Sequence, residues 1–218
     1  MMRPLGSSFL IGLLALVTTA AHSEPVQVTL TDANGQPLEF AVISVPGEPG
    51  RPLEQAIMDQ IDVQFRPHVL TVPVGSKVLF PNSDNIRHHV YSFSEAKTFE
   101  TQLYANEARP TISFDTAGIV ALGCNIHDQM RGYIYVSPHQ QSNVTDATGR
   151  ATVNLNGDTE LLIWHPWLQQ QKREQITVAV KDDQRELSLQ VDVKATEQSE
   201  EKPSRLQERF NRRTGNDE

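Results

Sequence analysis

The stretch Cys124-Asn125-Ile126-His127-Asp128-Gln129-Met130 carries the strongest signal in this chain. It places a thiol, an imidazole and a thioether at Cys-x2-His-x2-Met spacing within one short segment. Cys124 is the only cysteine, so no internal disulfide can form. Because one short loop carries three potential metal ligands, their spacing in the chain limits the distances between the donor atoms. A strand elsewhere must supply a fourth ligand.

The fourth ligand has two adjacent candidates upstream, His88 and His89. Thiolate, two imidazoles and thioether form the ligand set of a mononuclear blue-copper site, with three strong ligands in a plane and methionine as a weak axial ligand. Soft sulfur donors favour Cu(I), whereas imidazole serves both oxidation states. We therefore predict one type 1 copper per chain, bound by Cys124, His127, Met130 and one of the two upstream histidines.

Zinc is the competing metal. A zinc site would need more cysteine or histidine, or a carboxylate such as Asp128, and it would not need Met130. Taken singly, a cysteine, histidine or methionine in a β protein is mostly structural. The presence of all three in one short loop favours a metal site, and the thioether favours copper.

The rest of the chain is typical of an all-β protein, because short apolar or alternating runs are separated by turn residues. Helical periodicity is weak and confined to Glu54–Ile61 and the C-terminal tail. Residues 137–143 are predicted to be a polar connector. The expected strands are Val26–Leu30, Phe40–Val45, Val69–Val74, Lys77–Phe80, Val90–Phe93, Thr111–Phe114, Gly118–Gly123, Tyr133–Val136, Ala151–Leu155, Leu161–Trp164, Ile176–Val180 and Leu187–Val191.

The net charge of the chain limits the classes of macromolecule that it is expected to bind. The chain of 218 residues has 27 acidic and 19 basic residues, a formal net charge of −8. A nucleic-acid binder would need a basic face, so we expect no nucleic-acid partner. No internal stretch approaches the roughly 20 apolar residues of a membrane span.

The N-terminus has the pattern of a secretory signal peptide. Arg3 precedes the apolar run Phe9–Val17, and Ala21-His22-Ser23 fits a cleavage site before Glu24. We therefore expect residues 1–23 to be removed and the protein to be periplasmic, with no membrane span afterwards. In an oxidising compartment a lone thiol is a liability unless it is used or hidden, which again favours a metal ligand.

Residues 57–138 resemble the cupredoxins, and most closely the amicyanins and plastocyanin-like proteins of methylamine utilisation. Val63–Phe80 resembles the paired opening strands of that family, and Phe80-x-Asn82 precedes the first histidine as in the family. Ala117-Gly118 matches the turn before the cysteine strand, and Met130-Arg131-Gly132 continues the likeness after the short ligand loop.

The resemblance implies a Greek-key β-sandwich whose copper ligands are His88, Cys124, His127 and Met130. It implies a periplasmic electron-transfer protein, not an enzyme, with a dehydrogenase, a c-type cytochrome or both as redox partners. A link to methylamine oxidation follows from the same likeness. The family usually has asparagine directly after its first histidine, so His89 is expected to brace the ligand loop instead.

Segments on both sides resemble a carboxypeptidase regulatory-like (transthyretin-like) sandwich. These segments are Thr31–Leu38 with Ala41–Val45, and Thr145–Ala151 through Leu161–Trp164. Neither has enough strands to close a sandwich, so we predict an Ig-like sandwich with the cupredoxin inserted. The predicted parts are a signal peptide at 1–23, the first Ig-like part at 24–56, the cupredoxin at 57–138, the second Ig-like part at 139–193 and a charged tail at 194–218.

Two other functions fit the residues less well. A copper chaperone or storage protein could use the same ligands, and a non-catalytic β-sandwich could bind a sugar or a protein after losing its metal. All four copper ligands are present in the sequence, which argues against a domain that has lost its metal. Multicopper oxidases and nitrite reductases need further histidine-rich sites, and the remaining histidines here are scattered.

Overall fold

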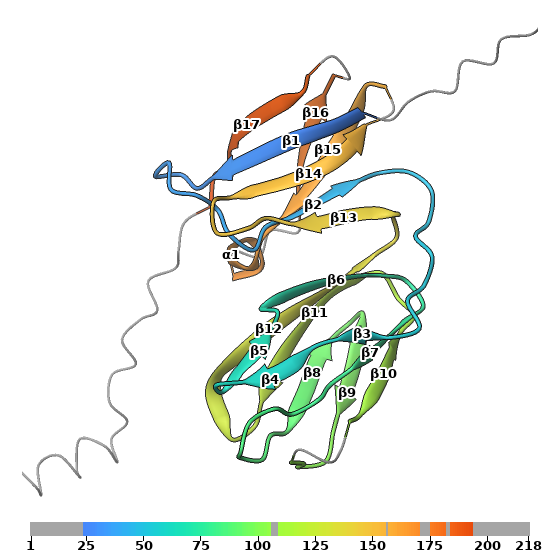
Figure 1. The fold of residues 1–218 in the computed structure, drawn as a ribbon, viewed down its shortest axis with the longest axis vertical. Coiled ribbons are helices and arrows are strands. Elements are labelled where there is room, and N and C mark those ends of the chain that lie inside the picture. The colour runs from blue at the N-terminus through green and yellow to red at the C-terminus, as the bar shows by residue number, and fades with distance from the viewer. Residues whose placement is uncertain (1–23, 106–108, 156, 171–174, 182–183, 194–218) are drawn as a thin grey trace, which may run out of the picture.

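The computed structural model describes residues 24–105, 109–155, 157–170, 175–181 and 184–193. The predicted signal peptide and tail lie outside these described residues. Within them the chain is almost entirely β, as predicted, and forms two sandwiches that Figure 1 shows one above the other. No helix in the described part of the chain is long and apolar enough to cross a membrane.

The flanking sandwich, the upper body in Figure 1, is built from the two ends of the described chain. One of its sheets has the order β14-β1-β17 and the other the order β13-β2-β15-β16. The strands are β1 (Glu24–Thr31), β2 (Val42–Val45), β13 (Gln141–Val144), β14 (Arg150–Leu155), β15 (Thr159–Trp164), β16 (Ile176–Val180) and β17 (Glu186–Gln190).

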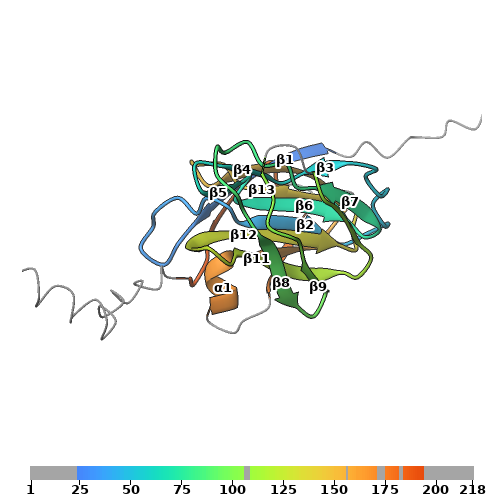
Figure 2. The ribbon, with the colours of Figure 1, turned by 90° about the horizontal axis from the view of Figure 1, so that it is seen from below.

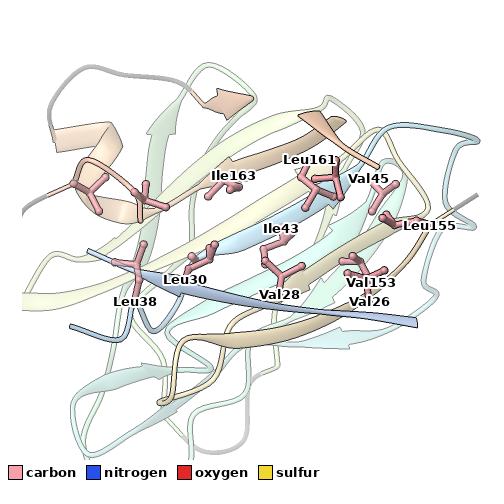
Figure 3. Packing of buried hydrophobic residues seen from close by; sticks show 14 of the residues in the cluster. Val26, Val28, Leu30, Leu38, Ile43, Val45, Val153, Leu155, Leu161 and Ile163 are labelled. Carbon is pink, nitrogen blue, oxygen red and sulfur yellow. The ribbon is translucent and has the colours of Figure 1, made fainter. Parts of the chain in front are cut away.

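Alternation explains the core of the flanking sandwich. Val26, Val28 and Leu30 of β1 are fully buried, while the residues between them face outward. They pack against Ile43 and Ile163 of the opposite sheet, as Figure 3 shows.

The central sandwich, the lower body in Figure 1, contains the segment between β2 and β13. Its larger sheet has the order β6-β12-β11-β8-β9 and its smaller sheet the order β10-β7-β3, with β4 and β5 paired beside them. The strands are β3 (Ala56–Ile57), β4 (Asp59–Ile61), β5 (Gln64–Arg66), β6 (Val69–Pro73), β7 (Ser76–Leu79), β8 (Val90–Ser94), β9 (Lys97–Glu100), β10 (Thr111–Phe114), β11 (Gly118–Cys124) and β12 (His127–Ser137).

Two local expectations were wrong. The weak helical signal at Glu54–Ile61 belongs to β3 and β4, where burial alternates with a period of two. Apolar side chains occupy both faces there, with Met58 buried and Ile57 exposed, so hydrophobicity alone did not show the strand period. The polar connector at 137–143 contains part of β13, whose polar side chains lie on a half-buried sheet edge.

The short helix α1 (Pro166–Gln170), which begins with proline, was not expected.

A third cluster of buried residues forms the seam between the two sandwiches. Trp164, at the end of β15, packs against Tyr133 and Tyr135 of β12 with ring centroids 5.5 and 6.1 Å apart. His165 follows Trp164 and is 3% exposed. Its Nε2 lies 2.9 Å from the Glu39 carbonyl oxygen, and its Nδ1 accepts a hydrogen bond from the Trp167 amide.

The buried His165 predicts a pH-dependent stability. Burial lowers the pKa of His165 to about 4, with the Glu39 carbonyl opposing the shift and the nearby His68 adding to it. Between pH 6.5 and 4 the unfolded chain binds a proton that the folded protein does not, so stability falls as the pH falls. The lost free energy of unfolding is about 3 kcal/mol.

Urea unfolding of wild type, His165→Gln and His139→Gln at pH 7.5 and 4.5 measures this loss. We expect His165→Gln to show a smaller loss than wild type. The control His139→Gln replaces a partly exposed histidine and should behave like wild type. Equal losses in all three proteins would contradict the assignment.

Candidate metal centre

The ligand loop is a tight hairpin turn between β11 and β12. Cys124 pairs directly with His127 across the two intervening residues, Asn125 and Ile126, and the register shifts between Gly123 and Cys124. This pairing brings the Cys124 Sγ to 3.5 Å from the Nδ1 of His127. Spacing along the chain therefore suffices to bring these two side chains together.

His88 reaches the same place from the neighbouring strand. β8 pairs with β11 so that Val90 lies opposite Cys124, which puts His88 at the end of the sheet beside the thiol. The His88 Nδ1 is 3.7 Å from the Cys124 Sγ, and the His88 side chain is fully buried. Backbone hydrogen bonds in both directions, 2.9 and 3.0 Å long, tie His88 to Tyr104.

Asp84 holds the orientation of the His88 ring. Its Oδ2 lies 2.7 Å from the His88 Nε2, and its carboxylate also accepts the backbone amides of Asp62 and Val63. Burial tends to raise the pKa of Asp84, but the bonds from Val63, His88 and Asp62 outweigh it and lower the pKa below its usual value. The ionised carboxylate accepts a hydrogen bond from the Nε2–H group, so the Nδ1 lone pair faces the thiol.

The turn that supplies these two amides is itself unusual. Asp62 and Val63, between β4 and β5, have φ values of 55° and 57°. A β-branched residue is rarely found in this left-handed region, which Asn-Gly normally occupies in such turns. Asp84 accepts both amides of the turn, so the β4–β5 hairpin and the His88 ring depend on one carboxylate.

The three donor atoms fit a metal ion. Among the described residues, His88, Cys124 and His127 form one group of possible metal ligands whose donor atoms all lie within 4.8 Å of one another. Metal–nitrogen and metal–sulfur bonds of about 2.0–2.3 Å in a trigonal plane put neighbouring donors roughly 3.6 Å apart. The two measured sulfur–nitrogen distances, 3.5 and 3.7 Å, match that spacing.

The surroundings of these donors favour copper over zinc. No carboxylate belongs to the group in the described part of the chain; Asp84 contacts the far nitrogen of His88, and Asp128 is exposed. Met130 is 1% exposed and lies in the same buried cluster as Cys124. Met58, the other methionine of that cluster, is fully buried.

His89 occupies a different environment from His88. Its Nε2 lies 3.0 Å from the Glu100 Oε1, and its Nδ1 is buried without a hydrogen-bond partner. The expected brace of the ligand loop comes from its backbone, because its carbonyl oxygen accepts the Asn125 amide at 3.3 Å.

Sequence reasoning missed the supports behind His88. Tyr104 is buried and donates from its hydroxyl to the Phe80 carbonyl oxygen at 3.0 Å, while the Gln60 side-chain amide donates to that hydroxyl. Burial raises the pKa of Tyr104 to about 12, so it stays a neutral donor. Neither residue has a sequence signal, because Tyr104 meets His88 across a β-bridge from a separate segment, and Asp84 meets it through the conformation of the loop that joins them.

No family model and no curated protein matches the chain. Similar solved structures include a copper-containing nitrite reductase from Thermus scotoductus SA-01, 28% identical over 40% of this chain with a TM-score of 0.36. The purple cupredoxin of Nitrosopumilus maritimus is 24% identical, over 38% of this chain and 98% of its own, with a TM-score of 0.34. A reduced tryptophan-to-tyrosine variant of amicyanin is 20% identical, over 44% of this chain and 98% of its own, with a TM-score of 0.37. The match spans only 22% of the nitrite reductase.

The central β-sandwich, which carries His88, Cys124 and His127 together at one end of its larger sheet, resembles a cupredoxin in fold, as the sequence predicted. The closer likeness to amicyanins and the transthyretin-like nature of the flanking strands stay predictions.

The geometry predicts different effects for the two adjacent histidines. His88→Ala removes a donor beside the thiol, so we expect the Cu(II)-loaded protein to lose its intense sulfur-to-copper charge-transfer band. His89→Ala should keep the band, shifted at most, because only the backbone of His89 meets the ligand turn. Visible spectra of both variants measure this. Loss of the band in His89→Ala alone would move the ligand to His89.

Proposed function

We propose that this protein is a one-electron carrier with one type 1 copper held by His88, Cys124, His127 and Met130. The observation that carries the proposal is the placement of the Cys124 Sγ at 3.5 and 3.7 Å from the two Nδ1 atoms. Copper bound there would supply a Cu(II)/Cu(I) couple. The fold holds the donors in one geometry, with His88 and Cys124 buried, so little reorganisation would accompany a change of oxidation state.

The surface around His127 supports a role in docking. His127 is the partly exposed member of the group, and Ile126 beside it is 51% exposed. Ile86 and Leu103 are 44% and 47% exposed on the neighbouring loops. Asn82 and Tyr104 link these loops by hydrogen bonds. An apolar rim around a partly exposed ligand suits brief contact with a redox protein.

The wider setting is also proposed. We infer a periplasmic location from residues 1–23. The likeness to amicyanins suggests an amine-oxidising dehydrogenase and a c-type cytochrome as the classes of redox partner. We propose no enzymatic role for this chain. We also propose that 24–56 with 139–193 and 57–138 are two domains, the second inserted in the first. Their separate cores support this division.

The reduction potential tests the axial ligand and the carrier role together. The wild type should give a reversible one-electron couple with fast self-exchange, which a copper storage protein does not need. Met130→Gln should keep copper and lower the potential, because an oxygen donor stabilises Cu(II) relative to Cu(I). Met58→Leu, in the same core, is the matched control and should leave the potential unchanged. The opposite pattern would make Met58 the axial ligand.

Charge and the apolar rim predict how a partner docks. With a net charge of −8, the protein should attract a basic cytochrome, and the electron-transfer rate should fall severalfold between low salt and ~0.1 M, where the screening length is ~10 Å. Ile126→Lys should slow transfer without changing the spectrum, because it places a positive charge beside His127.

Stopped-flow mixing with the cytochrome measures both effects. The matched control is Leu53→Lys, which adds the same charge at a residue that is 43% exposed. The Leu53 carbonyl oxygen accepts a hydrogen bond from the Lys77 amide of β7, in the smaller sheet. A salt-independent rate, or equal slowing by both variants, would contradict docking at His127.

A further inference from the structure

The seam between the two sandwiches contains one histidine from each of them. His165 follows β15 of the flanking sandwich, and His68 precedes β6 of the central sandwich. Both side chains contact the segment Glu39-Phe40. The Glu39 carbonyl oxygen accepts a hydrogen bond from the His165 Nε2, and the Phe40 ring meets the His68 ring edge-on with centroids 5.0 Å apart. Two imidazoles from different sandwiches therefore meet on one short segment.

His165 fits its place only while it is neutral. Its Nε2 donates to the Glu39 carbonyl oxygen at 2.9 Å, and its Nδ1 accepts the Trp167 amide at 3.2 Å. A proton on Nδ1 would set two N–H donors against each other on a side chain that is 3% exposed. The hydrogen bonds themselves therefore disfavour a charged His165 in the closed seam.

The groups around the two histidines do not compensate for their burial. Burial is the largest cause that lowers the pKa of His68, and Arg66 adds to this shift. The Arg131 backbone and Glu39 oppose the shift without cancelling it. At His165 the bond to the Glu39 carbonyl likewise opposes burial, and the charge of a protonated His68 acts against a second proton there.

The backbone between the two histidines is strained. Phe40 has a φ of 66°, in the left-handed region that residues with a side chain seldom adopt. Its amide donates to the Thr145 carbonyl oxygen at 3.2 Å, while its ring packs on His68 of the other sandwich. Such a conformation persists only where surrounding contacts hold it, and it is common in segments that switch. Separation of the seam would remove one of these contacts.

The seam is small and has open space beside it. Figure 2, a view from the side of the central sandwich, shows β6 and β12 lying over β2 of the flanking one. The buried cluster there consists of Val42, Val69, Tyr133, Tyr135 and Trp164. Tyr135 and Trp164 also line a cavity of about 750 Å³, together with Ile119 and Leu162 from the two sandwiches. Each sandwich has its own core, so the seam can open without unfolding either.

We propose that His68 and His165 form a proton-operated latch that keeps the seam closed at neutral pH and lets it open in acid. An imidazole that leaves the seam for water binds a proton more readily, so each proton bound favours the open form. Opening exposes the aromatic cluster and frees β12 from the flanking sandwich.

The direction and size of the effect follow from linkage. The closed form keeps its stability above pH ~6.5, the ordinary pKa of histidine, and loses it as the pH falls toward the lowered pKa of His165, about 4. From His165 alone, the ratio of open to closed protein rises roughly 70-fold between pH 7.5 and 4.5.

Tryptophan quenching tests the latch. Trp167→Phe leaves Trp164 as the single tryptophan and keeps an aromatic ring beside His165. Trp164 is 1% exposed, so acrylamide, a neutral quencher, reaches it only when the seam opens. The bimolecular quenching constant is measured from pH 7.5 to 4.5 in this background, and circular dichroism follows the folding of the sandwiches. His165→Gln, His68→Gln and the control His139→Gln are then added singly; His139 is partly exposed and lines the same cavity.

We expect the quenching constant to rise severalfold in acid while the circular dichroism stays that of the folded protein. His165→Gln and His68→Gln should each reduce the rise, and His139→Gln should keep it. The radius of gyration of the wild type, from small-angle X-ray scattering, should grow over the same pH range. If His165→Gln fails to fold, His68→Gln and the scattering titration decide.

Three results would overturn the latch. The first is a quenching constant that does not change with pH, and the second is a rise that occurs only together with loss of the circular dichroism. The third is an equal rise in all the variants, which would assign the change to groups other than these two histidines.

Discussion

The pairing of β8 with β11 is the interaction on which the candidate metal centre depends. It sets Val90 opposite Cys124, and from that register His88 meets the thiol while His89 turns toward Glu100. A shift of one residue would exchange the faces of every side chain on β8. The register is well determined because the inward side chains of β8 are buried, so a slipped strand would put polar or aromatic residues into the core.

Buried polar groups then convert this register into a fixed geometry. Asp84 fixes the ring of His88, and the same carboxylate accepts the amides of the strained turn at Asp62 and Val63. Tyr104 holds the His88 backbone from the other side. Each buried donor left without an acceptor would cost about 1–3 kcal/mol, so these groups resist rearrangement.

β12 connects the ligand hairpin to the rest of the molecule. The strand begins at His127 and carries Asp128 and Met130 in its first turn-proximal residues. Further along the same strand, Tyr133 and Tyr135 pack on Trp164 of the flanking sandwich. One strand thus belongs both to the ligand group and to the seam. His165, next to Trp164, is buried at this seam. Acidification that protonates His165 therefore weakens the seam, and β12 runs from the seam to the candidate metal centre.

The sequence by itself determined the all-β class and the chemistry of the ligand loop, because Cys124, His127 and Met130 lie within seven residues and a two-residue turn suffices to bring the first two together. It did not distinguish His88 from His89 by chemistry, since both are histidines in adjacent positions. Only the tertiary structure placed Asp84 and Tyr104 beside His88, because Tyr104 meets it across a β-bridge from a separate segment and Asp84 meets it through the conformation of the loop before it. Short-range geometry follows from the chain itself, whereas contacts such as that between His88 and Cys124, 36 residues apart, depend on strand register, which only packing of the whole sandwich decides.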